Sequence, residues 1–221
     1  MTAAKLNCDP ILASATRKDA SQRTFFIRGF AAILAWLVMV CVGMLLLIDY
    51  SSAPGTTNFN SDSWPNNSEI SRGVRVPTLI MFLHPRCPCS RASLNELARL
   101  LADRHGTVAI RTVFFCPDGE SEAWAQTGHW DLAARLSDDQ PIVDLQGREA
   151  GRFGASTSGY VCLFSQTGKR LFGGGITSGR GHEGENLGSQ AVQQLLDGTN
   201  TEPVSYPVYG CPIQSNLANS R

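Results

Sequence analysis

Two cysteines flank a proline in Cys87-Pro88-Cys89, and these residues are the best candidates for chemistry in the sequence. They stand where the apolar run "VPTLIMFL" (76–83) gives way to a helical pattern. A cysteine at a helix start is acidified, because the free N–H groups and the dipole of the first turn favour the nucleophilic thiolate. Arg86 adds positive charge beside it. The spacing therefore predicts a nucleophilic Cys87.

We interpret the two cysteines as a redox pair that exchanges disulfides with protein or small-molecule thiols, without a cofactor. In this interpretation Cys87 attacks or is attacked, and Cys89 closes or opens the disulfide. A disulfide between residues two apart closes a small ring and departs from relaxed geometry, so it is easily reduced. His84 is a candidate proton shuttle, because the reference pKa of histidine lies near neutrality. Arg86 is expected to support the thiolate.

Three other interpretations stay open. Thiolates select soft ions such as Cu(I), so the pair could hold copper with a histidine, above all His182, or with His84 or Cys211. Both cysteines could instead be inert core residues, because cysteine is often buried. Finally, Cys87 could react with peroxides, as low-pKa cysteines do. The residues that could then resolve or assist it are Cys89, Cys116, Cys211, Thr157 and Arg180.

A glycine-rich stretch, "GGGITSGRGHEGEN" (173–186), is a candidate functional loop, because it is a poor core strand and carries charges. Its Arg180 and His182 are expected to reach the face that carries the cysteines. It contains no Walker or dinucleotide-binding glycine pattern, so phosphate binding is not indicated. Near the end of the chain, "YPVYGCPI" could fold back onto the domain and bring Cys211 as a further thiol.

Strands and helices alternate in the region that must position these residues. Apolar runs predict strands at 76–83, 107–115, 141–145, 160–164 and 169–174, and amphipathic spacing predicts helices at 90–105, 121–136 and 188–198. This order predicts an α/β domain with a mixed sheet, partly parallel and covered by helices, with a late hairpin at an antiparallel edge.

The cysteine region resembles the thioredoxin superfamily: an apolar strand with Phe82, four residues, and then Cys87 at the opening of a helix. Downstream, "IVDLQGREAGRFGASTSGYVCLFSQTGKRLF" is similar to membrane-anchored thioredoxin-like and peroxiredoxin-like proteins. The combination of C-P-C with a late "GGIT…RGH" resembles proteins called RedB. The resemblance covers about residues 76–198 and implies a thioredoxin-like fold and thiol–disulfide chemistry.

The sequence departs from the pattern of that superfamily at four places. The usual C-x-x-C is C-x-C, and Arg86 stands where a tryptophan usually precedes the first cysteine. Met81 replaces the buried acid of the first strand, and the loop that usually carries a cis-proline reads "STSGY" (156–160). The activity of the superfamily therefore does not follow from the resemblance alone.

Residues 29–48 form an uncharged run of 20 residues, long enough to cross a bilayer as a helix. Five Lys and Arg residues precede this run, and none follows before Arg72. This asymmetry predicts a cytoplasmic N-terminus and a periplasmic C-terminal domain in the cell inner membrane, with an uncleaved signal-anchor. With 19 basic and 19 acidic side chains, the charge balance gives no indication of a nucleic-acid partner.

The predicted organisation has five parts. They are a cytoplasmic segment (1–28), a transmembrane helix (29–48), a flexible linker rich in Ser, Asn and Gly (49–74), a thioredoxin-like domain (75–200) and a C-terminal tail (201–221).

Overall fold

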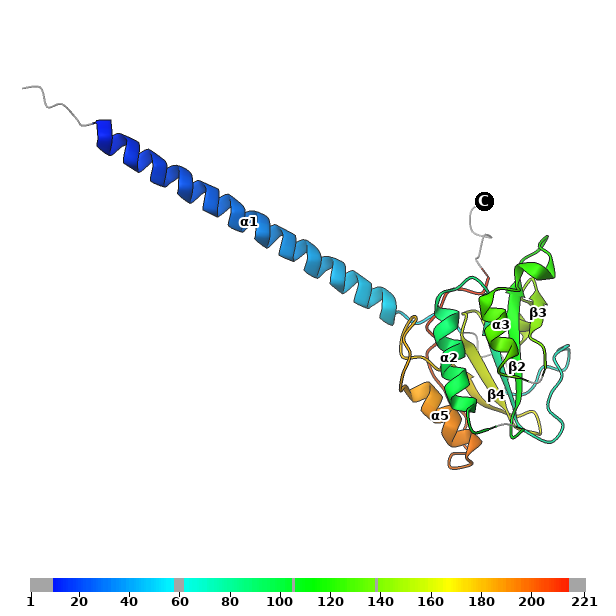
Figure 1. Ribbon diagram of the computed structural model, residues 1–221. Helices are drawn as coiled ribbons and strands as arrows, with labels where there is room; N and C mark the ends of the chain where they lie inside the picture. Colours follow the sequence, from blue (N-terminus) through cyan, green and yellow to red (C-terminus); the bar gives the residue numbers. More distant parts are fainter. Residues whose placement is uncertain (1–9, 58–61, 105, 138, 215–221) are drawn as a thin grey trace, which may run out of the picture. The chain divides into compact units, whose positions relative to one another are not determined.

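The computed structural model describes residues 10–57, 62–104, 106–137 and 139–214 (Figure 1). The chain divides into two compact units, Met1–Tyr50 and Ser51–Arg221. The predicted segment 1–28 and tail 201–221 thus lie partly outside the described residues.

The first unit is a long helix, α1 (Pro10–Ser52). Its part Phe25–Ser52 is long and apolar enough to cross a membrane, and none of that part is buried. Among the described residues it is the one helix that meets this condition. The predicted single apolar helix is therefore confirmed, with ends a few residues beyond 29–48.

The second unit is built on a six-stranded mixed sheet with the order β3-β2-β1-β4-β5-β6. Strands β1, β2 and β3 are parallel, β4 is antiparallel to both β1 and β5, and β6 is parallel to β5. The late hairpin β4–β5 is present as predicted, but β6 covers the outer side of β5. The strands are β1 (Thr78–Leu83), β2 (Ala109–Cys116), β3 (Ile142–Leu145), β4 (Tyr160–Phe164), β5 (Arg170–Gly174) and β6 (Val204–Ser205).

Helices cover the sheet as the sequence predicts. Most of them lie on one face, here called the first face. Leu79, Met81 and Leu83 of β1 pack with residues of α2, α3 and α5 in one hydrophobic cluster. The helices are α2 (Cys89–Leu101), the 3₁₀ turn η1 (Glu122–Trp124), α3 (Gly128–Ala134), α4 (Arg148–Arg152) and α5 (Leu187–Leu196). The predicted helix 121–136 is thus interrupted, because the Thr127 side chain caps a new helix by accepting from the His129 N–H.

The second face of the sheet carries a separate cluster around Phe82. It includes Phe153 beside α4, Ile70 from the stretch before β1, and Val208 and Ile213 from the C-terminal segment. Burial of β1 on both faces explains its unbroken apolar sequence.

The stretch predicted as a flexible linker (49–74) contributes to this second face. The Trp64 ring lies edge-on to Phe153 and Phe164, with centroids 5.2 and 5.0 Å apart. Ile70 is buried, and the Ser68 hydroxyl donates to Glu149 at 2.7 Å. Part of the predicted linker therefore belongs to the folded domain, because its few apolar side chains find partners there.

Candidate functional site: three thiols at the start of helix α2

Cys87 lies in the turn that joins β1 to α2. Its N–H donates to the carbonyl of His84 at 3.1 Å, and its own carbonyl accepts from the Ser90 N–H at 3.0 Å. Pro88 stands directly before the helix with φ −58°, and the helix begins at Cys89. A proline suits this position, because its φ is helical and the missing N–H would have no helical acceptor. The strand-to-helix junction predicted for the cysteine pair is present.

Three sulfur atoms meet at this junction. The Sγ atoms of Cys87 and Cys211 are 2.7 Å apart, and both lie within 4.8 Å of the Sγ of Cys89. Cys87 is only 1% exposed, whereas Cys89 and Cys211 are partly exposed. The Cys89 sulfur that the sequence paired with Cys87 is within 4.8 Å of it, and the structure adds the Cys211 sulfur in direct contact with Cys87.

The environment favours the thiolate at Cys87 alone. Burial raises the pKa of Cys87, but hydrogen bonds from the Cys211 thiol and from the backbone N–H groups of Cys211, Cys89 and Ser90 hold it below the ordinary value. Burial raises the pKa of Cys89, and the neighbouring Cys87 sulfur raises it further. The same two causes raise the pKa of Cys211 to about 12. Cys87 is thus the thiol of this group that loses its proton most readily.

Backbone pairing places Cys211 beside the loop before β4. The Ser158 N–H donates to the carbonyl of Cys211 at 2.8 Å, and the Ile213 N–H donates to the carbonyl of Ser156 at 2.9 Å. Thr157 and Pro212 form the antiparallel bridge between these bonds. The segment approaches the loop so closely that a Cβ on Gly210 would lie 2.0 Å from the carbonyl oxygen of Ser158.

A buried pair of serines joins this loop to the cysteine turn. The Ser158 hydroxyl accepts from the His84 N–H at 2.8 Å and lies 2.8 Å from the Ser90 hydroxyl, which donates to the His84 carbonyl at 3.0 Å. Sequence reasoning missed both serines, and no local signal separates them from other serines of the chain. Ser158 stands in the loop where the resemblance leads one to expect a cis-proline, and the described residues contain no cis peptide bond.

The two arginines predicted to support the site have different surroundings. Arg180 donates to the Gly210 carbonyl, and its charge acts to lower the pKa values of Cys89 and Cys211, opposing their burial. Arg86 lies over the Trp124 ring, with its guanidinium carbon 4.2 Å from the ring centroid. Arg180 is therefore a neighbour of the thiols, while Arg86 forms a cation–π contact above the turn.

His84 lies in an aromatic environment. Its ring stacks on Phe115 at 5.8 Å and lies edge-on to Trp124 at 5.7 Å. Burial and the charge of Arg86 lower the pKa of His84, and its Nδ1 accepts from the Arg86 N–H at 3.2 Å. His84 is thus held mostly neutral near pH 7, and its predicted role as a proton shuttle stays a prediction.

Three further predicted residues have other contacts. The Thr157 hydroxyl donates to the carbonyl of Thr56 at 2.9 Å, and the Nδ1 of His182 lies 3.1 Å from the carbonyl of Arg180. Cys116 is buried in the core, where its thiol faces backbone carbonyls, and burial raises its pKa. Across the described ranges, the group whose atoms could hold a metal ion is Cys87, Cys89 and Cys211, and it does not include His182.

The first three glycines of the stretch 173–186 allow the C-terminal segment to approach β5 closely. The Tyr206 N–H donates to the Gly173 carbonyl, and the Gly175 N–H donates to the Pro207 carbonyl, each at 3.2 Å. A Cβ on Gly174 would lie 2.3 Å from the Tyr206 carbonyl oxygen. The glycines therefore let the C-terminal segment cross β5 on its way to the thiols.

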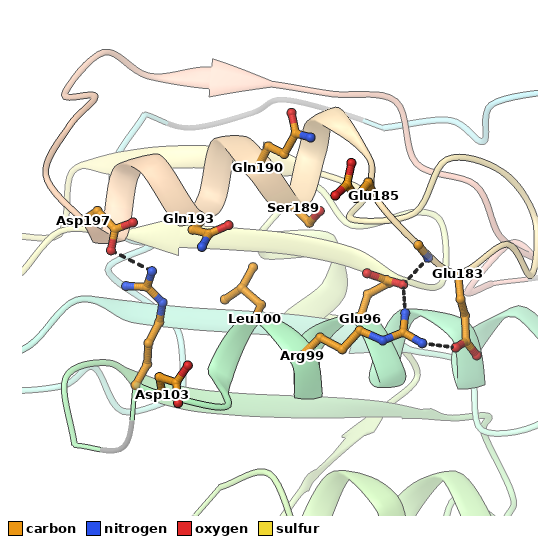
Figure 2. Close-up of a pocket in the computed structure, with 12 residues that line it drawn as sticks. Glu96, Arg99, Leu100, Asp103, Glu183, Glu185, Ser189, Gln190, Gln193 and Asp197 are labelled. Carbon is orange, nitrogen blue, oxygen red and sulfur yellow. Dashed lines mark hydrogen bonds and ion pairs between the residues drawn. The ribbon is translucent and has the colours of Figure 1, made fainter.

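A cavity of about 790 Å³ between α2 and α5 is separate from the thiol group, since no cysteine lines it (Figure 2). On its wall, the nearly buried Glu96 binds Arg99 and the Gly184 N–H, and Arg99 also binds Glu183 at 2.8 Å. Figure 2 shows these side chains joining α2 to the glycine-rich loop. These contacts hold α2 and the glycine-rich loop together, which is a structural role.

No known family model and no curated protein matches this sequence. Solved structures do match. An uncharacterized conserved protein from Geobacillus kaustophilus is similar at 18% identity with a TM-score of 0.51, over 76% of this chain and 91% of that one. A hypothetical protein from Sinorhizobium meliloti is similar at 19% identity with a TM-score of 0.49, over 63% and 80%.

A secreted disulfide oxidoreductase from Mycobacterium tuberculosis, homologous to E. coli DsbE, is also similar, at 12% identity and a TM-score of 0.40, over 57% of this chain and 84% of that one. At these identities the likenesses concern the fold alone. The domain has the predicted architecture, a mixed α/β sheet flanked by helices, and shares its fold with the Geobacillus protein.

Proposed function

We propose that this protein is a membrane-anchored thiol–disulfide oxidoreductase with Cys87 as its nucleophile. The observation that carries the proposal is the group of three sulfur atoms at the start of α2, in which the Cys211 thiol contacts Cys87 at 2.7 Å. Hydrogen bonds lower the pKa of Cys87, while burial raises those of its two neighbours. The thiolate is the form that attacks a disulfide, so the site combines one attacking group with two protonated thiols able to complete the exchange.

The apolar helix supports the anchored part of the proposal. Phe25–Ser52 exposes its apolar side chains, as a helix facing lipid would. The excess of Lys and Arg before this helix favours an N-terminus in the cytoplasm and a domain on the outer side of the inner membrane. Such a compartment permits disulfides, and its exported proteins would be the source of substrate thiols and disulfides.

The pH dependence of alkylation tests the state of Cys87. In the reduced protein, we expect iodoacetamide to label Cys87 with a midpoint below that of an ordinary cysteine, because only the thiolate reacts and its pKa is lowered. Labelling of Cys87 should fall as the pH drops through that midpoint. Peptide mapping by mass spectrometry follows each cysteine separately. Cys89, whose pKa is raised, is the internal reference and should label with a higher midpoint.

Reversed order of the two midpoints would remove the physical basis for Cys87 as the nucleophile. Replacing Cys211 by alanine sharpens the measurement, because it removes the thiol that donates to Cys87. The midpoint of Cys87 should then move upward. An unchanged midpoint in that variant would show that the hydrogen bond does not acidify Cys87.

Copper binding is the second candidate, favoured by three sulfur atoms that lie within 4.8 Å of one another. Three thiolates suit a soft ion such as Cu(I). The reduced protein is expected to retain about one Cu(I) per chain against a competing chelator, and Cys211→Ser to weaken retention by at least about tenfold, as loss of one ligand of three would. Cys116→Ser, outside the group, is the matched control. Equal retention by both variants would exclude the three-thiol site.

A further inference from the structure

The C-terminal segment lies in contact with the sulfur that the proposed function requires. Cys87 is 1% exposed, and the nearest sulfur to it is that of Cys211 at 2.7 Å. A disulfide exchange needs the incoming sulfur to reach Cys87. Because Cys211 is in contact with this buried sulfur, we expect the residues around Cys211 to move before a substrate disulfide reacts.

The structure gives this segment few attachments beside the thiols. Residues Tyr209–Ile213, here called the tail segment, are held to the loop before β4 by two backbone hydrogen bonds and by Arg180 on the Gly210 carbonyl. Buried Val208 precedes the tail segment and buried Ile213 ends it, and these side chains favour the closed position. Opening around Cys211 that leaves Val208 and Ile213 buried breaks only these few bonds and therefore needs less free energy than global unfolding.

We propose that the tail segment is a gate that carries the resolving thiol, so that Cys211, rather than Cys89, completes the exchange begun by Cys87. This inference rests on the proposed function. Opening of the tail segment exposes Cys87 to a substrate disulfide, and closing returns Cys211 to the sulfur that has reacted. The same residues thus protect the thiolate and finish the reaction.

Geometry favours Cys211 over Cys89 as the partner. A disulfide between Cys87 and Cys89 would close a small ring through Pro88 at the very start of α2, where the backbone is fixed by the helix. Cys211 comes from a separate segment with its Sγ already in contact with that of Cys87. A bond between these two requires only small movements of a short segment.

Electrostatics favours the same order of events. Burial and the neighbouring Cys87 sulfur raise the pKa of Cys211 in the reduced protein. Once Cys87 is bound in a mixed disulfide, its sulfur carries no negative charge, and that cause of the raised pKa is removed. The positive charge of Arg180 then still favours the Cys211 thiolate. Reaction of Cys87 thus removes one cause of the raised pKa of Cys211, while the effect of burial remains.

The exchange takes place in two steps that conserve atoms and electrons. The Cys87 thiolate attacks one sulfur of a substrate disulfide, forms a mixed disulfide and releases the other substrate sulfur as a thiolate. The Cys211 thiol gives up its proton and attacks the Cys87 sulfur, and the second substrate sulfur leaves as a thiolate that takes up a proton. The substrate disulfide gains two electrons, and Cys87 and Cys211 lose two as they become a disulfide. A dithiol reductant returns them to the starting state.

Glutathione disulfide, added to the reduced full-length protein in detergent micelles, tests the inference. After acid quenching, peptide mapping should find a Cys87–Cys211 disulfide in the unmodified protein and in Cys89→Ser. In Cys211→Ser, glutathione should stay on Cys87, with a lifetime at least about tenfold longer, because the thiol held beside it has gone. Protection of the buried Cys162 from alkylation verifies that each variant is folded.

The outcomes separate this inference from the proposed function. A Cys87–Cys89 disulfide in Cys211→Ser, together with a trapped adduct in Cys89→Ser, would overturn the role of Cys211 and leave the proposed function standing. Absence of both adduct and disulfide at Cys87 in every folded protein would overturn the proposed function itself, and the inference with it.

Discussion

Cys87→Ser is expected to reduce the catalysed reduction of insulin disulfides by dithiothreitol to the uncatalysed rate. Cys87 is the one member of the thiol group whose pKa is lowered, whereas those of Cys89 and Cys211 are raised. Burial still raises the pKa values of the two remaining thiols in this variant, so they would attack disulfides slowly near neutral pH. The rate of insulin precipitation, compared with that of the unmodified protein at equal concentration, measures the loss.

Cys116→Ser is the matched control for this loss. The Cys116 thiol is buried like that of Cys87, but it faces the carbonyls of Pro117, Glu120 and Ser121 at 3.5–3.9 Å. A serine hydroxyl can donate to the same carbonyls, so the variant should fold and keep the activity. Activity retained by Cys87→Ser would contradict the assignment of the nucleophile.

Gly210→Ala is expected to move two measured rates in opposite directions. The new methyl group would lie 2.0 Å from the Ser158 carbonyl oxygen, a backbone atom that cannot turn away, so the tail segment must shift. Alkylation of Cys87 should become faster, by about tenfold or more, because its cover has moved. Conversely, glutathione should remain longer on Cys87, because Cys211 no longer returns to the contact position.

Gly151→Ala provides the comparison, since a Cβ there meets nothing within 4 Å. It should change neither rate. Continued protection of Cys162 in Gly210→Ala would show that the domain is still folded, because this cysteine is fully buried in β4. If both rates equal those of Gly151→Ala while Cys162 stays protected, the tail segment does not control access to Cys87.

Local patterns in the sequence predicted the elements that carry the first two cysteines. The unbroken apolar run before Cys87 forms the central strand β1, buried on both faces, and the proline between the cysteines stands directly before α2. The apolar run at 29–48 lies within the helix that could cross a membrane. These features depend on residues close together in the chain, so periodicity and turn chemistry suffice to predict them.

Errors occurred where distant residues decide the structure. Trp64 and Ile70 lie in a stretch whose Ser, Asn and Gly content indicates a linker, yet both pack against the second face of the sheet. In the candidate loop 173–186, Arg180 lies near the thiols as expected, but composition did not show that Gly173, Gly174 and Gly175 make room for the C-terminal segment. Composition of a stretch does not show which surface it will meet, because packing partners come from elsewhere in the chain.

By itself, the sequence determined the fold class, one apolar helix and a cysteine pair at a strand-to-helix junction. Only the tertiary structure decided which thiol touches Cys87. Cys211 lies 124 residues further along the chain, and it reaches Cys87 through backbone pairing with the loop that holds Ser158. Every residue except proline offers the same backbone donor and acceptor, so the residue types near Cys211 do not show with which segment it pairs.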